Sequence, residues 1–89
     1  MAERQATIAS RVGLHARPAK IFIEAVKRQS VPVTIALGDA APMDASSILT
    51  IMALGAGNGD VVTLRAEGDG ADAALAELAA VLETDHDAE

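Results

Sequence analysis

The residues with the clearest chemical potential lie in the segment Gly13-Leu14-His15-Ala16-Arg17-Pro18-Ala19. A histidine at the start of a helix has its ring beside the unpaired N–H groups of Ala16 and Arg17, where the helix dipole favours an anion. A neutral imidazole is nucleophilic near pH 7, and its bond to phosphorus is labile enough to release a phosphoryl group again. Arg17 adds a planar fork of donors that can bind two phosphoryl oxygens. This segment therefore predicts reversible phosphoryl transfer at His15, with the Arg17 side chain and the backbone of Ala16 and Arg17 holding the phosphate.

The simpler alternative is that His15 only caps a helix while Arg17 points to solvent, because motifs built on one histidine often arise by chance. Nothing in the sequence indicates a stand-alone enzyme. No second catalytic histidine, paired carboxylates or nucleotide loop accompanies His15, and the run Gly55-Ala56-Gly57-Asn58-Gly59 lacks the lysine of a phosphate-binding loop. The chain has no cysteine, and His15 and His86 are far apart in sequence, so no metal or cofactor is implied.

Hydrophobic periodicity predicts the elements that must position this segment. Residues 2–9 form a short β-compatible run that ends before Gly13. From His15 to about Arg28, apolar residues recur at offsets of three and four, which predicts an amphipathic helix. Pro18 is compatible with the opening turn, because the first four N–H groups of a helix have no internal partner.

The remaining chain predicts two antiparallel strands, another helix, a strand and a final helix. The strands are expected at Val31–Leu37, near Pro42–Asp44 and at Val61–Ala66. The first of the two helices is expected at Ile48–Leu54, capped by Ser46 or Ser47. The final helix has Asp72 in its opening turn and Leu75, Leu78 and Leu82 on its inner face. The order βαββαβα predicts an α+β open-faced β-sandwich, with a four-stranded antiparallel sheet and three helices on one face. We expect one domain over residues 1–89, with 84–89 as a frayed tail.

The composition limits the kinds of partner that the chain can bind. A net charge of −6 and a single aromatic residue, Phe22, argue against nucleic acid. The first 28 residues carry six basic and two acidic side chains, against one and eleven in the rest. This asymmetry predicts attraction of an acidic partner, the alternative being an ordinary solvated surface. Because no apolar run could serve as a signal peptide or membrane span, we expect a cytoplasmic protein without direct membrane insertion.

The short helix at Ile48–Leu54 predicts a contact surface. Ile48, Leu49 and Met52 cannot all face the interior, because consecutive helical residues point about 100° apart. Some apolar surface should therefore be exposed, and it would complement the basic Arg17, Lys20 and Lys27 if it lay near His15. The alternative is that all three apolar residues belong to the core.

The segment Gly13–Ala19 resembles the active-site signature of HPr, the family of histidine-containing phosphocarriers of the bacterial phosphoenolpyruvate-dependent sugar phosphotransferase system. The stretch from Ser46 to Gly55 resembles that family too, and the likeness covers residues 2–83. The resemblance implies that enzyme I phosphorylates His15 on Nδ1 with a group taken from phosphoenolpyruvate, and that His15 then donates it to enzyme IIA domains for sugar uptake and phosphorylation. It implies a carrier, expected as a monomer, with Arg17 assisting. The alternative is a regulatory interaction module of the same fold, in a nitrogen-related branch.

The resemblance also implies a docking patch and a regulatory serine. The patch for enzyme I and enzyme IIA would comprise Lys20, Lys27, Ile48, Leu49 and Met52. In relatives, an ATP-dependent kinase phosphorylates a serine at the start of this helix and a phosphorylase removes the phosphate. Ser47, directly before Ile48, fits that serine best, with Ser46 as the alternative. A serine kinase and transcriptional regulators would then be further partners. The simpler interpretation is that Ser46 and Ser47 only cap the helix.

Overall fold

The computed structural model describes residues 2–9, 13, 16–38 and 40–84 of the chain. Its elements are β1 (Ala2–Thr7), α1 (Ala16–Lys27), β2 (Val33–Leu37), β3 (Met43–Asp44), α2 (Ile48–Leu54), β4 (Val61–Ala66) and α3 (Ala71–Leu82). The four strands form one antiparallel sheet in the spatial order β1-β4-β2-β3. The predicted element order is confirmed.

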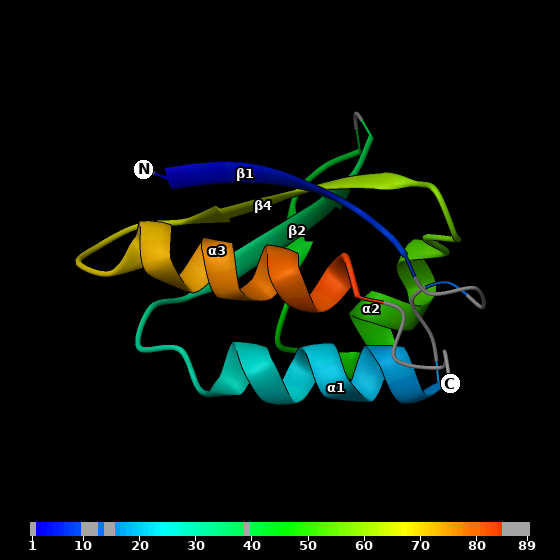
Figure 1. Cartoon of the computed structure of the whole chain (residues 1–89), viewed down its shortest axis with the longest axis horizontal. Helices are drawn as coiled ribbons and strands as arrows, with labels where there is room; N and C mark the ends of the chain where they lie inside the picture. Colours follow the sequence, from blue (N-terminus) through cyan, green and yellow to red (C-terminus); the bar gives the residue numbers. More distant parts are fainter. Residues whose placement is uncertain (1, 10–12, 14–15, 39, 85–89) are drawn as a thin grey trace.

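The molecule has two layers, because the central strand β4 alternates between buried and less buried residues and so turns one face to the core. Figure 1 shows the sheet as one layer, with α1, α2 and α3 against the same side of it. Ile35 of β2 lies opposite Leu64 of β4, and both are fully buried in the core. Their neighbours Thr34 and Arg65, also paired, point to the opposite face. The predicted open-faced sandwich is therefore the fold.

The core lies between the sheet and the two longer helices. Phe22, the single aromatic residue, is completely buried on α1. It belongs to the same cluster as Leu75 and Leu78 of α3 and Ile51 of α2. The helical spacing that predicted these inner faces is thus confirmed. Among the described residues, no helix is long and apolar enough to span a bilayer.

Several boundaries differ from the sequence-based expectation. β2 begins at Val33 rather than Val31, and Pro32, which has no N–H to donate to a ladder, precedes it. β1 ends at Thr7, because Ile8 and Ala9 form their hydrogen bonds outside the sheet. In the expected tail, Thr84 donates from Oγ1 to the Ala80 carbonyl at 2.8 Å. Residues 85–89 lie outside the described part.

Candidate functional site

The N-terminal turn of α1 is the centre of the candidate site. Ala16 is its first helical residue, so His15 directly precedes the helix in sequence, although His15 itself lies outside the described residues. Arg17 is exposed and Pro18 is buried in the same turn. The turn contains no acidic residue, whereas the first turn of α3 contains Asp72. The positive end of the α1 dipole is therefore reinforced by Arg17 and not neutralised by a carboxylate within the helix.

Gly13 packs its backbone against the loop between α2 and β4. It is buried and has a φ of +78°, a conformation that L side chains rarely adopt. A Cβ at this position would lie 2.6 Å from the Ala56 carbonyl oxygen and 2.9 Å from Gly57 Cα. Only glycine allows so close an approach. The residue two positions before His15 is thus held directly on residues 56 and 57.

The end of β1 is bound to the same loop. The Ile8 N–H donates to the Asp60 carbonyl at 2.9 Å, and the Gly59 N–H donates to the Ile8 carbonyl at 2.8 Å. Asn58 Nδ2 donates to the Ala9 carbonyl at 3.1 Å. Sequence reasoning considered this run only as a phosphate-binding loop without its lysine, and missed its contacts with residues 8, 9 and 13. The glycines on both sides of Asn58 were the available signal, because they allow a tight turn.

The apolar surface predicted on α2 exists. Ile48 is 40% exposed, Met52 49% and Leu49 77%, whereas Ile51 faces the core. α2 begins at the N-cap residue Ser47 and ends at Gly55, which has a φ of +69°. Figure 1 shows α2 beside the N-terminal half of α1, and the two helices are in contact. The expectation that some of this apolar surface is exposed is confirmed, and the alternative that all three residues belong to the core is wrong.

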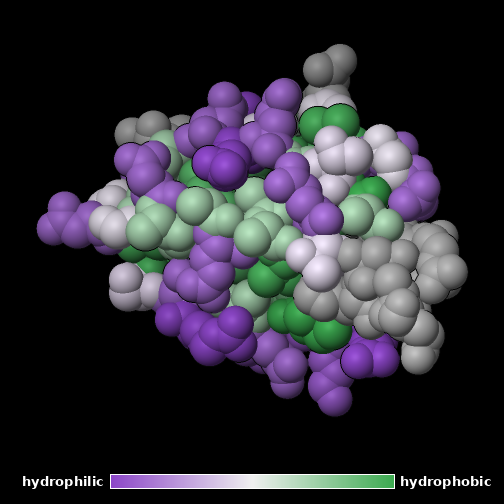
Figure 2. Space-filling view, viewed as in Figure 1, coloured by the Kyte–Doolittle hydropathy of each residue, from purple (hydrophilic) through white to green (hydrophobic). Residues whose placement is uncertain are grey.

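The basic residues of α1 do not form one cluster. Arg17, Lys20 and Lys27 are all exposed, with the acidic Glu24 between them on the same face. Figure 2 shows hydrophilic side chains along the lower edge of this view, where α1 runs. Lys27 lies about 15 Å along the helix from Arg17, at 1.5 Å per residue. Arg17 and Lys20 share the end of α1 where His15 precedes it, while Lys27 marks the other end.

Ser46 and Ser47 have different hydrogen-bond partners. Ser46 donates to Asp44 Oδ1 from its backbone N–H at 2.9 Å and from its Oγ at 2.7 Å. These two bonds hold the pKa of the Asp44 carboxyl below its usual value, because they stabilise the ionised form. Ser47 Oγ instead accepts from the Thr50 N–H at 3.3 Å and so caps α2. Lys27 lines a hollow together with Asp44 and Ser46.

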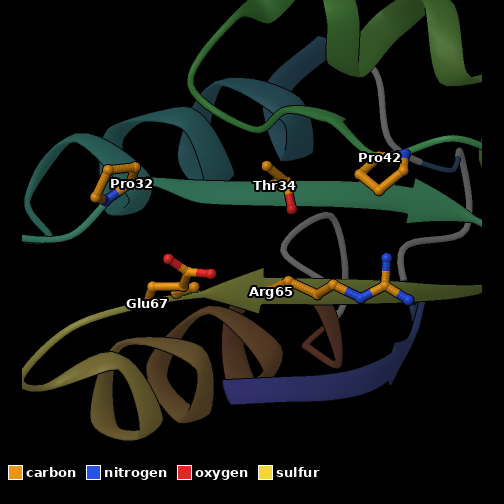
Figure 3. A pocket seen from close by; sticks show the side chains of 6 residues that line it. Pro32, Thr34, Pro42, Arg65 and Glu67 are labelled. Atoms are coloured by element: carbon orange, nitrogen blue, oxygen red, sulfur yellow. The ribbon is translucent and has the colours of Figure 1, made fainter. Parts of the chain in front are cut away.

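A second hollow, of about 470 Å³, is lined by residues of β2, β4 and their adjoining loops, among them Thr34 and Arg65 on the face of the sheet away from the core. Figure 3 shows its lining side chains on β2 and β4 and in the adjoining loops. Thr34 and Arg65 face each other across the two strands. The Arg65 guanidinium is already engaged, because its Nε donates to Glu3 Oε2 at 2.7 Å. The hollow is therefore separate from the start of α1 and adds nothing to that site.

Comparison with known proteins shows the family to which this fold belongs. Residues 2–84 match the family model described as the PTS HPr component phosphorylation site. The phosphocarrier protein HPr of Streptomyces coelicolor is 47% identical over 79 residues, which are 89% of this chain and 85% of that protein. The HPr of Haloferax volcanii is 40% identical over 92% of this chain and 93% of its own length. The crystal structure of HPr-C-His from Thermoanaerobacter tengcongensis superimposes with a TM-score of 0.89 at 36% identity, covering 100% of this chain and 99% of that one.

A family model of a phosphorylation site matches the chain from β1 to the end of α3, and the fold agrees with a solved member at every element. The carrier interpretation of the sequence is therefore confirmed. The chain belongs to the HPr family of phosphotransferase system phosphocarriers, and it carries phosphoryl groups between proteins without being a stand-alone enzyme.

Proposed function

We propose that His15 is the residue that carries the phosphoryl group, and that Arg17 and the backbone N–H groups of Ala16 and Arg17 stabilise it there. The observation that carries the proposal is the first turn of α1, which begins directly after His15, contains an exposed Arg17 and has no carboxylate. A dianionic group on the preceding residue would meet amides that have no partner within the helix and a guanidinium that can bind two oxygens. Enzyme I is the donor and enzyme IIA domains are the acceptors.

The transfer needs one nucleophile and no cofactor. The lone pair of the unprotonated ring nitrogen, Nδ1, forms a bond to phosphorus, while the bond between phosphorus and its donor breaks and leaves its electron pair on the donor. Negative charge on the phosphoryl oxygens is then shared by the α1 amides and Arg17. The reverse steps pass the group to the acceptor. In this proposal the protein acts in the cytoplasm as a monomer, and residues 1–89 form a single domain.

The direct test is to locate the phosphoryl group. We expect the protein to become labelled when it is incubated with enzyme I and radiolabelled phosphoenolpyruvate. The label should be lost in acid and kept in alkali, as expected of a phosphohistidine, and mass spectrometry of peptides should place it on His15. A label on another residue, or no label with active enzyme I, would remove His15 from the proposed role.

The exposed apolar residues of α2 are proposed to dock enzyme I and enzyme IIA. We expect Leu49→Asp to raise the KM for phosphorylation by enzyme I about tenfold or more, because a carboxylate would have to be desolvated in the contact, and tenfold corresponds to about 1.4 kcal/mol. Leu49 is 77% exposed, so the fold should tolerate the change. Steady-state kinetics provides the measurement. Ala76→Asp, on the exposed surface of α3, is the matched control and should leave KM unchanged. Equal KM values in both variants would place docking elsewhere.

Ser47 is proposed as the regulatory serine in preference to Ser46. A phosphate on Ser46 would remove the hydroxyl donor of the 2.7 Å bond to Asp44 Oδ1 and bring two negative groups together. Within the described part of the chain, the Ser47 hydroxyl oxygen is hydrogen-bonded to the Thr50 N–H and not to a carboxylate. With ATP and an HPr serine kinase, we expect Ser46→Ala to be phosphorylated like the wild type and Ser47→Ala not at all. Ser47→Thr, which keeps both hydroxyl and cap, separates loss of the acceptor from a weakened helix. Phosphorylation of Ser47→Ala would reverse the assignment.

A further inference from the structure

We propose that Asn58 is a positioning residue for phosphoryl transfer, because it fixes the chain segment that leads to the histidine. This inference rests on the proposed function of His15. The link is the hydrogen bond from Asn58 Nδ2 to the Ala9 carbonyl, 3.1 Å long, which joins residues 49 positions apart. Asn58 thus acts on the site through the backbone, and its side chain is not assigned a contact with the phosphoryl group.

Ala9 follows the end of β1 and lies six positions before His15 in the sequence. Its N–H donates to the Leu82 carbonyl at the end of α3, 3.0 Å away. Its carbonyl accepts from Asn58. Both polar groups of this residue are therefore bound, one by α3 and one by the loop before β4. Because β1 has already ended at Thr7, the sheet no longer holds the chain here, and these bonds do so instead.

The same loop also holds the chain on the far side of residues 10–12. Gly13 lies against the Ala56 carbonyl oxygen and Gly57 Cα. The position of Gly57 is itself fixed by Asp60, whose Oδ2 accepts from the Gly57 N–H at 2.8 Å and whose N–H donates to the Gly57 carbonyl at 3.0 Å. One closed turn, residues 57–60, therefore sets the positions of Ala9 and Gly13 together.

Holding both sides on one turn matters because phosphoryl transfer depends on in-line geometry. A displacement of about 1 Å at a reacting group can cost up to about a hundredfold in rate. The docking residues of α2 and the first turn of α1 do not contact Asn58 through any bond described above. Loss of the Asn58 bond should therefore affect the transfer step more than the binding of enzyme I.

A competing explanation is that Asn58 serves only the shape of its turn, since asparagine is common in turns. Asn58→Asp separates the two roles. Aspartate has nearly the same shape and a similar turn preference, but its ionised carboxylate cannot donate a hydrogen bond and would repel the Ala9 carbonyl. Asn58→Ala removes the donor without adding this repulsion. Asn58 is exposed, so both variants should remain folded.

The experiment measures phosphorylation by enzyme I and phosphoenolpyruvate for the wild type, Asn58→Ala and Asn58→Asp. We expect kcat to fall about three- to tenfold in Asn58→Ala and at least as much in Asn58→Asp, with KM within about twofold of the wild type. Amide hydrogen exchange should become faster in both variants at Ala9 and Gly59, whose N–H groups donate to the Leu82 and Ile8 carbonyls. Gln29→Ala is the matched control. Gln29 Nε2 also donates to a backbone carbonyl, because it bonds to that of Ala25 at 3.0 Å, and this bond lies near the C-terminal end of α1. It should leave kcat unchanged.

Two results would overturn the proposal. One is a kcat for Asn58→Asp equal to that of the wild type, which would mean that Asn58 serves only the shape of its turn. The other is an equal loss of kcat in Gln29→Ala, which would make the effect one of general stability. Failure of the proposed function is distinguishable from both, since the wild type itself would then carry no label on His15.

Discussion

His15→Ala should accept no phosphoryl group from enzyme I, whatever the time of incubation. The expected loss is complete because the ring nitrogen is the nucleophile itself, and no other group described near the first turn of α1 could form a transferable bond to phosphorus. Arg17 is always protonated and has no lone pair to offer. The α1 amides can bind a phosphoryl group but cannot carry one. Because His15→Ala would carry no phosphoryl group, it should also transfer none to enzyme IIA.

The measurement is incorporation of label from phosphoenolpyruvate, read after separation of the proteins by electrophoresis. His86→Ala is the control, since His86 is the one other histidine of the sequence and should be dispensable. Circular dichroism and the melting temperature of both variants check that a loss of label does not come from unfolding. Label on His15→Ala, or its loss in His86→Ala, would contradict the assignment of the phosphoryl group to His15.

The sequence predicts the layers of this fold well because apolar periodicity and burial have the same cause. The inner faces of α1 and α3 follow offsets of three and four, and Phe22, Leu75 and Leu78 are buried as that spacing requires. Strand ends are predicted less well. The alternation from Val31 to Leu37 continues through Pro32, and periodicity alone does not report that proline cannot donate to a ladder.

The candidate site is predictable only in part, for a related reason. The chemistry of a helix start is local, so the types and order of His15, Ala16 and Arg17 suffice to propose it. The frame around it depends on contacts between residues far apart in sequence. Asn58 and Ala9 are 49 positions apart, and no spacing rule connects them. The different partners of Ser46 and Ser47 likewise depend on where β3 places Asp44.

Gly13→Ala should destabilise the protein by about 2–4 kcal/mol and slow phosphoryl transfer at least tenfold. The left-handed conformation, with φ at +78°, costs alanine about 1 kcal/mol or more. The added Cβ would also lie 2.6 Å from the Ala56 carbonyl oxygen and 2.9 Å from Gly57 Cα. Both atoms belong to backbone, so the loop or the segment before α1 must move, at a further cost of about 1–3 kcal/mol. Either movement shifts the residue two positions before His15.

Gly38→Ala separates the two causes. Gly38 also has a positive φ, +58°, but a Cβ there would meet nothing within 4 Å, so this variant carries only the backbone cost. Urea unfolding should therefore show a clearly smaller loss for Gly38→Ala than for Gly13→Ala, and only the latter should lower kcat with enzyme I. Equal losses of stability would mean that Gly13 does not pack as closely on the loop as described. The contact of Gly13 with residues 56 and 57 is what positions the segment before His15 in this account. An unchanged kcat in a folded Gly13→Ala would therefore show that transfer does not depend on this contact.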